Sequence, residues 1–270
     1  MRRIRLYRWR NKKSQHGNFG DEITIPILDR LFGIEAVPVR LEDAELLGAG
    51  SILEHYAWGN RRRWTWRRWF FRGDLHVWGA GTLFSDHLID WPQRLRFHAV
   101  RGSLTAKRVG ANAVALGDPG ILASRLVDRP KQRNGVAVVP HFVDKKRVSL
   151  PKDWQIVDPE QRVDDVLCQV GSAELVLSSS LHGLIVADSF GIPCVWVKYF
   201  AESPHLPGSP THKFIDYAST RGCDFNSPVT WAEAMTMSRD TLEAISTTAL
   251  RDINEWQAEL ISAFPLGVWK

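Results

Sequence analysis

The sequence predicts an α/β protein with two Rossmann-like halves, each built on a parallel sheet. The clearest sign is the stretch from Glu174 to Tyr199, which has the pattern of an apolar strand, a serine turn, a helix, a Gly-Pro stop and a second strand. Further apolar runs that end in glycine turns precede it. A polar run with Pro and Gly, Asp128 to Gly135, is typical of a linker. We therefore expect an N-terminal domain over 1–128 and a C-terminal domain over 129–270.

The other elements follow from periodicity along the chain. The apolar runs that we assign to strands are Ile4–Trp9, Ala44–Ala49, Leu75–Trp78, Arg96–Val100, Val114–Leu116, Val136–Val139 and Trp154–Val157. Helical spacing indicates helices over Glu22–Phe32, Ser103–Val109, Val163–Val170 and Lys213–Tyr217, from Thr230 onward, and through Trp256 to about Phe264. The segment from Ala201 to His212 is rich in Pro, Gly, Ser and His, which favours a mobile active-site loop.

Composition limits the classes of function. The 270 residues are 44% hydrophobic and 24% charged, and the net charge is only +5, so the composition gives no reason to expect nucleic-acid binding. Cys168, Cys194 and Cys223 form no close pair, which argues against a disulfide framework or a zinc site and fits a reducing cytosol. The N-terminus lacks the apolar core of a signal peptide, and no apolar run approaches the ~20 residues of a membrane span. We expect a cytoplasmic protein.

Three turns in the first half are candidates for contact with a ligand. Asn18 and Gly20 can form a tight turn, with Asp21 capping or opening the next helix, although a plain strand-to-helix turn would explain the same residues. Gly50 and Gly81 lie in two Gly-x-Gly-Ser/Thr turns, where glycine lets the backbone approach a ligand. Neither turn is a complete dinucleotide or P-loop motif, so the turns predict a binding site without naming its ligand.

Two further candidates, one in each half, lie where an apolar run ends. Arg101 follows an apolar run directly, where a guanidinium could hold a phosphate or carboxylate through two hydrogen bonds. His141 follows Val136–Val139 and is a possible ligand contact.

The serine turn of the central stretch is the strongest candidate site. Ser178, Ser179 and Ser180 offer hydroxyls and capping groups at the start of a helix. His182 lies one turn further, beside backbone N–H groups that favour an anion. A titratable side chain next to an anion site is a catalytic candidate, and the alternative is a capping cluster with a half-buried histidine.

A basic, aromatic insertion interrupts the first half over 54–72. On a helix, the segment Arg61–Arg72 would place arginines on one face and Trp66, Trp69 and Phe70 on the other. This pattern is typical of a membrane-interface element, but it could also bind an acidic glycan or nucleic acid, or pack on the domain with solvated arginines. We favour the interface, because Trp64 and Phe71 would lie off the aromatic face.

The order of the motifs resembles that of the polysaccharide pyruvyl transferase family, particularly its bacterial exopolysaccharide ketalases of the succinoglycan type. The motifs are NFGDEITIPIL, GAGSI, WGAGT, RGSLTAKRVG, LGDPG, VVPHFVD and SSSLHGLIVADSFGIPCVWV. The resemblance implies two halves that face a cleft, as in the glycosyltransferases called GT-B. It also implies transfer of the enolpyruvyl unit of phosphoenolpyruvate, as co-substrate, onto two sugar hydroxyls, which gives a pyruvate ketal and phosphate. It implies neither a metal nor a further cofactor.

The resemblance also assigns roles to residues. His182 matches the family histidine, which can donate or accept a proton. The residues expected to bind the donor are Arg101, Ser179, Ser180 and His141. Those expected on the acceptor side, in the N-terminal domain, are Asn18, Asp21, Gly50 and Gly81. Some members carry an arginine where this chain has Ser180, so the second donor-binding charge stays open among Lys198, Arg125 and His141.

The sequence is also compatible with two other functions. One is a glycosyltransferase that uses a nucleotide sugar, and the other is a non-catalytic binder of an anionic polymer or membrane through Arg61–Arg72. For the pyruvyl transferase, the expected partners are phosphoenolpyruvate, a sugar or lipid-linked oligosaccharide, and the inner-membrane surface, to which the protein would bind peripherally.

Overall fold

The computed structural model describes residues 2–10, 14–55, 73–83, 94–111, 113–146, 150–198 and 211–269. The predicted interface segment Arg61–Arg72 lies outside these residues, as does most of the predicted loop from Ala201 to His212. Within the described part, no helix combines the length and the apolar composition that a bilayer crossing requires.

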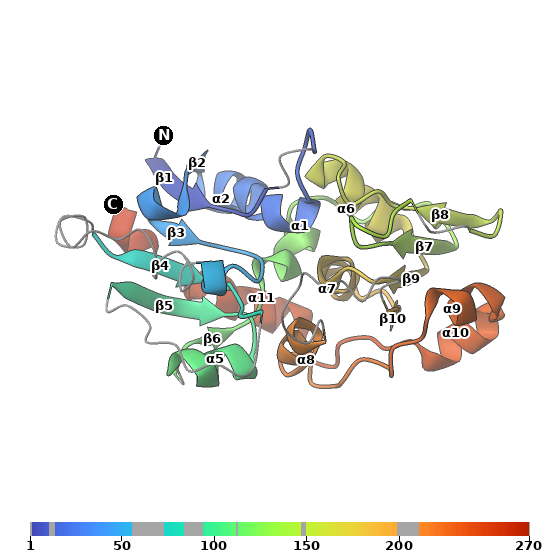
Figure 1. The fold of residues 1–270 in the computed structure, drawn as a ribbon. Coiled ribbons are helices and arrows are strands. Elements are labelled where there is room, and N and C mark those ends of the chain that lie inside the picture. The colour runs from blue at the N-terminus through green and yellow to red at the C-terminus, as the bar shows by residue number, and fades with distance from the viewer. Residues whose placement is uncertain are drawn as a thin grey trace.

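The first half is a six-stranded parallel sheet with the strand order β2-β1-β3-β4-β5-β6 (Figure 1). Its strands are β1 (Arg2–Tyr7), β2 (Ile34–Pro38), β3 (Leu46–Leu47), β4 (Leu75–Trp78), β5 (Leu95–Val100) and β6 (Ala115–Leu116). Its helices and 3-10 turns are α1 (Phe19–Glu22), α2 (Thr24–Phe32), η1 (Leu41–Asp43), α5 (Ser103–Val109) and η2 (Pro119–Arg125).

The second half contains a four-stranded parallel sheet with the order β10-β9-β7-β8. Its strands are β7 (Val136–Val139), β8 (Trp154–Ile156), β9 (Leu175–Ser178) and β10 (Cys194–Trp196). The remaining elements are α6 (Val163–Ser172), α7 (Leu181–Ser189), α8 (His212–Ala218), α9 (Trp231–Thr236), α10 (Arg239–Ile245), α11 (Ile253–Ser262) and η3 (Leu266–Trp269). Two parallel sheets confirm the predicted α/β class, whereas the likeness to GT-B stays a prediction.

Local sequence explains where the first helices begin and end. The side chain of Asn18 accepts a hydrogen bond from the Gly20 N–H, so Asn18 caps α1. Of the two predicted roles of Asp21, capping is wrong, and Asp21 lies in the first turn of α1. The predicted helix over Glu22–Phe32 is α2, which ends at Gly33 with φ 64°, a left-handed conformation that glycine adopts at little cost.

The two halves share one hydrophobic core. A single cluster of buried side chains includes Ile4 and Trp78 from the first half and Val139 and Leu184 from the second. Separate clusters cover the outer faces of the two sheets. Because apolar area is buried continuously across the junction, hydrophobic contacts fix the two sheets relative to each other.

The last helix, α11, packs on the first sheet although it follows the second one in sequence (Figure 1). The Trp78 indole N–H donates to the Leu260 carbonyl at 2.9 Å, and the Trp256 indole N–H donates to the Leu116 carbonyl at 2.7 Å. The last strand of the first sheet ends at Leu116, and the first strand of the second sheet begins at Val136. The predicted domain boundary at residue 128 lies between these two strands and stays a prediction.

A buried ion pair connects α7 to the segment after α8. Arg221 donates two hydrogen bonds to the carboxylate of Asp188, at 2.7 and 2.8 Å, and both side chains are 0% exposed. The Tyr217 hydroxyl donates a third bond to the same carboxylate at 3.2 Å. In this bidentate geometry, the attraction between the two buried charges best offsets the free energy that it costs to remove them from water.

Candidate active site

The first sheet reverses its strand order between β1 and β3, and ligands of parallel sheets bind at such a reversal. The turn that opens α1 and the glycine turn after β3 meet there. The Ala49 N–H donates to the Thr24 hydroxyl at 2.9 Å, and a Cβ built on Gly50 would lie 3.0 Å from Asp21 Oδ1. The structure therefore brings the predicted acceptor-side residues Asn18, Asp21 and Gly50 to one point.

The second sheet reverses its order between β7 and β9, and three of the four predicted donor-binding residues, His141, Ser179 and Ser180, follow these strands. The His141 N–H donates to the Ser179 hydroxyl at 2.9 Å, and that hydroxyl donates to Asp144 Oδ2 at 3.4 Å. The serine turn precedes the helix as predicted, and Ser180 occupies the N-cap position of α7, but its side chain makes no capping hydrogen bond. The Ser178 hydroxyl instead accepts the Ser180 N–H at 3.0 Å.

His182 lies between the strand-order reversals of the two sheets. It is the second residue of α7, and a Cβ built on Gly20 would overlap its ring. The neighbouring Phe19 ring meets the imidazole edge-on, with centroids 6.2 Å apart, and the Phe19 N–H donates to the Pro159 carbonyl at 2.8 Å. Glycine at position 20 is therefore what lets α1 approach the histidine this closely.

This close approach gives a prediction about stability. Replacing Gly20 by alanine should lower the free energy of unfolding by about 1–3 kcal/mol, because the new methyl group must displace the His182 ring or α1. Urea denaturation would measure the loss. Gly73→Ala is the matched control, since no atom lies within 4 Å of a Cβ built there. Equal stability of the two variants would contradict the close packing.

Asp118 is the carboxylate that faces His182, and the sequence had not identified it as a site residue. Its Oδ2 lies 3.6 Å from His182 Nε2, while its Oδ1 accepts the Gly120 N–H at 2.9 Å. The carboxylate is fully buried at the turn between β6 and η2. The available signal was the LGDPG motif, in which an aspartate follows a strand and caps a Pro-Gly turn. The separation of 3.6 Å is too long for a hydrogen bond, and both atoms are buried without a hydrogen-bond partner among the described residues, so Asp118 acts on the imidazole through its charge.

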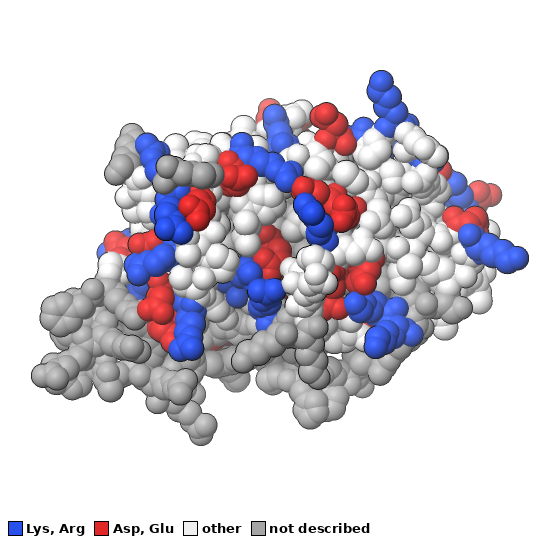
Figure 2. Space-filling view, turned by 90° about the horizontal axis from the view of Figure 1, so that it is seen from above, with Lys and Arg blue, Asp and Glu red and all other residues white. Residues whose placement is uncertain are grey.

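Burial raises the pKa of the Asp21 carboxyl to about 6. His182, Lys213 and Arg8 oppose that shift through their charges, and Asp118 adds to it. A carboxyl group with a pKa near neutral can exchange a proton with a ligand under physiological conditions. Viewed from above, acidic and basic side chains lie close together in the middle of the molecule (Figure 2).

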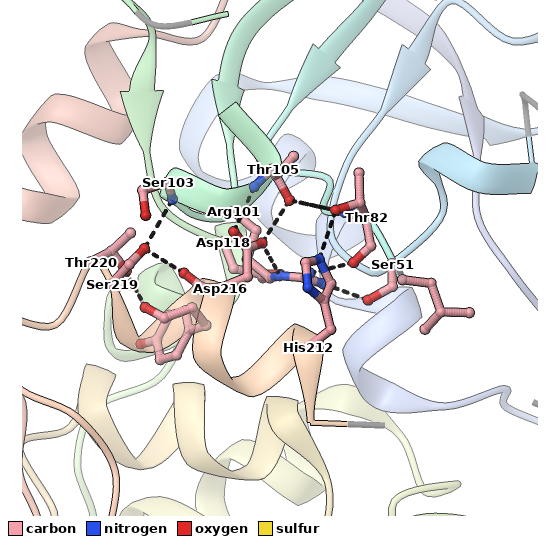
Figure 3. A network of polar contacts seen from close by, with 12 residues as sticks. Ser51, Thr82, Arg101, Ser103, Thr105, Asp118, His212, Asp216, Ser219 and Thr220 are labelled. Atoms are coloured by element: carbon pink, nitrogen blue, oxygen red, sulfur yellow. Dashed lines mark hydrogen bonds and ion pairs between the residues drawn. The ribbon is translucent and has the colours of Figure 1, made fainter. Parts of the chain in front are cut away.

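The predicted donor-binding residue Arg101 is bound by other parts of the protein (Figure 3). Its side chain is 0% exposed, and its Nε donates to Asp216 Oδ2 at 2.9 Å. Further bonds run to the Ser51 hydroxyl and, at 2.6 Å, to the Thr82 carbonyl. In this structure Arg101 fixes α8 to the glycine turns. A Cβ built on Gly81 would overlap the guanidinium, so Gly81 makes room for Arg101.

The three candidates for the second donor-binding charge differ in their surroundings. Arg125 donates to Gln257 Oε1 at 2.6 Å and so packs against α11. Lys198 is exposed just after β10. His141 lies at the site, but burial, together with the charges of Lys213 and His182, holds its pKa well below the usual value. It is therefore a neutral hydrogen-bonding group at pH 7.

Comparisons with known proteins agree with the order of the motifs. The model of the family described as polysaccharide pyruvyl transferase matches residues 18–199. The chain is 30% identical over 247 residues to the succinoglycan biosynthesis protein ExoV of Rhizobium meliloti (strain 1021), a match that covers 86% of this chain and 71% of that protein. It is 34% identical over 142 residues to the uncharacterized protein L143 of Acanthamoeba polyphaga mimivirus, a match that covers 47% of this chain and about half, 48%, of the viral protein.

Proposed function

The chain belongs to the polysaccharide pyruvyl transferase family, and on that premise we propose that it moves the enolpyruvyl group of phosphoenolpyruvate onto two hydroxyls of a sugar. The acceptor is an exopolysaccharide or its lipid-linked precursor, and the products are a cyclic pyruvate ketal and phosphate. The observation that supports this most directly is the meeting of Asp21, Asp118 and His182 where both sheets reverse their order.

The proposed reaction needs proton transfer at two places. His182, beside the carboxylate of Asp118, donates a proton to the methylene carbon of the enol as the first hydroxyl oxygen bonds to the central carbon. The carboxylate of Asp21 accepts the proton of that hydroxyl. The bond from the central carbon to the phosphate oxygen then breaks, phosphate leaves with the electron pair, and the second hydroxyl adds and loses its proton. The two hydroxyls thus lose two protons in total. One proton is matched by the proton that converts the methylene to a methyl group, and the other leaves on the phosphate.

The remaining predicted residues divide between the two substrates in this proposal. The phosphoenolpyruvate anion binds at the start of α7, beside Ser179, Ser180 and His141. Arg101 contributes positive charge near the donor and holds α8 in place through its hydrogen bond to Asp216. The sugar binds to the turn that contains Asn18 and Asp21, next to Gly50 and Gly81. The halves thereby take the donor and acceptor sides of a GT-B-like arrangement, and no metal or further cofactor takes part.

The role of Asp21 predicts a particular pH dependence. The group must be a carboxylate to accept a proton, and its pKa is about 6, so kcat/KM should fall about 10-fold per pH unit below pH 6. The residual activity of Asp21→Asn should lack this decrease. Asp29→Asn, an exposed change on α2, should keep it. An unchanged profile in Asp21→Asn would exclude Asp21 as the base.

Thermal unfolding with phosphoenolpyruvate, or with a nucleoside diphosphate, tests the donor. A ligand that binds only the folded state raises its stability, so the proposal predicts a higher Tm with phosphoenolpyruvate and no change with the nucleotide. The opposite result would favour a glycosyltransferase. Product formation is tested with labelled phosphoenolpyruvate and the lipid-linked oligosaccharides of cells that lack this protein, where acid-labile pyruvate on the glycan is expected.

Because a lipid-linked acceptor lies at the cytoplasmic membrane surface, we propose that the segment Arg61–Arg72 binds that surface. In this proposal its arginines and aromatic residues hold the enzyme peripherally on anionic lipid, near its acceptor. Replacing Trp66, Trp69 and Phe70 by serine should then reduce binding to anionic vesicles, and unchanged binding would contradict the proposal.

A further inference from the structure

Helix α8 lies at the junction between the two halves and contacts both (Figure 1). Toward the first half, His212 Nε2 lies 3.0 Å from the Thr82 hydroxyl, and Asp216 binds Arg101 (Figure 3). Toward the second half, the Phe214 ring stacks on Trp196 with centroids 4.5 Å apart. These contacts hold the helix in one orientation.

That orientation determines the direction of Lys213. Successive residues of an α-helix are rotated by about 100°, so His212 and Asp216 share the direction toward the first half. Phe214 and Tyr217 point toward the second half, and Ile215, which is 52% exposed, points outward. Lys213 falls between the two inward directions and roughly opposite Ile215. Its stem therefore runs into the junction, where it is half-buried.

The groups that face Lys213 come from several elements of the site. Asp21 lies on α1, Arg101 follows β5, and His141 follows β7, and each interacts electrostatically with the lysine. On α8 itself, the charge of Asp216 is paired with Arg101. Burial and the charge of Arg101 lower the pKa of Lys213 to about 8, against the effect of Asp21. The ammonium is therefore mostly charged at pH 7 and sensitive to any added negative charge.

We propose that Lys213 binds the phosphate or carboxylate group of phosphoenolpyruvate, an inference that rests on the function proposed above. Phosphoenolpyruvate is a small polyanion, and the carboxylates of Asp21 and Asp118 at the same place would repel it. Arg101 is enclosed by its protein partners, and His141 is neutral at pH 7. Lys213 is the cation that α8 directs into this junction. It lies beyond the 18–199 segment that the family model matches, so the inference depends on this structure.

Calorimetric titration with phosphoenolpyruvate tests the proposal. At pH 7, Lys213→Met should bind about 10- to 100-fold more weakly than the wild type, as expected for the loss of a charge-assisted hydrogen bond. Lys213→Arg should keep most of the affinity. The matched control is Lys107→Met, an exposed lysine on α5, against which α8 packs, and it should bind as the wild type does. Thermal unfolding without ligand checks that each variant is folded.

A second measurement separates a direct role from a structural one. Between pH 7 and pH 9 the wild type should lose about 10-fold in affinity, because Lys213 loses its proton near pH 8. Lys213→Arg should lose much less, because arginine stays protonated.

The possible outcomes distinguish the inference from the function on which it rests. If the wild type binds phosphoenolpyruvate and Lys213→Met binds equally well, the inference is wrong and the proposed function stands. If folded Lys213→Arg shows the same pH dependence as the wild type, Lys213 is not the titrating contact and the inference is likewise wrong. If the wild type shows no binding at concentrations on the order of 10 mM, above typical KM values, both are wrong.

Discussion

We expect His182→Asn to reduce kcat by about 10²- to 10⁴-fold, the range over which general acid–base groups contribute to catalysis. Asparagine retains a hydrogen-bonding amide near Asp118 but cannot transfer a proton at neutral pH. The measurement is phosphate release from phosphoenolpyruvate in the presence of acceptor. Because the proposed role of His182 is in the chemical step, the KM for phosphoenolpyruvate should change much less than kcat.

The control is His16→Asn, which removes an exposed imidazole from the loop before α1 and should leave kcat unchanged. The unfolding curve of His182→Asn should stay close to that of the wild type, which would separate a chemical defect from a folding defect. A His182→Asn variant that keeps more than about a tenth of the wild-type kcat would show that another group transfers the proton.

Asp188→Ala should produce the largest loss of stability, about 3–5 kcal/mol, because it leaves the buried guanidinium of Arg221 without a counter-charge. The same change removes the acceptor of the Tyr217 hydroxyl and of the Ala249 N–H, which bonds to Asp188 Oδ1 at 3.2 Å. Urea denaturation would show the loss as a lower midpoint. His182 lies at the other end of α7, and Asp21 and Asp118 lie on other elements, so kcat of the protein that remains folded should change little.

An exposed ion pair provides the comparison. Arg239 and Glu174 lie 2.7 Å apart, with side chains 47% and 40% exposed, and Glu174→Ala should cost less than about 1 kcal/mol. The double change Asp188→Leu with Arg221→Met should recover part of the stability, because it removes both charges and keeps apolar volume. If Asp188→Ala were no more harmful than Glu174→Ala, the buried pair would contribute no more than a surface pair.

Most of the strands could be predicted because a buried parallel strand is a continuous apolar run. Leu75–Trp78 and Val136–Val139 are fully buried and were predicted with the bounds that the structure has. The strand β2, Ile34–Pro38, was missed. It lies at the sheet edge, four of its five residues are at least partly exposed, and it contains Glu and Pro, so it lacks the apolar run that the prediction needed.

The site was only partly predictable, because local patterns do not show which distant segments meet. The sequence placed Asp21 and His182 at turns, and the structure brings both to the junction. It also placed Arg101 at a sheet edge, but its partner Asp216 is 115 residues away in the chain. Lys213 carries no motif, and its direction depends on how α8 packs against both halves.

The path of α11 determines how this enzyme could be recombined with its relatives. A chimaera joined at residue 128 would combine the resident first sheet with a foreign α11, and the partners of Trp78 and Leu116 would come from another protein. Exchanging only 129–252 keeps those contacts within one parent. The transplantable unit is thus an internal segment inserted into the first half, and we expect that exchange to yield folded hybrids more often than exchange of the whole C-terminal part.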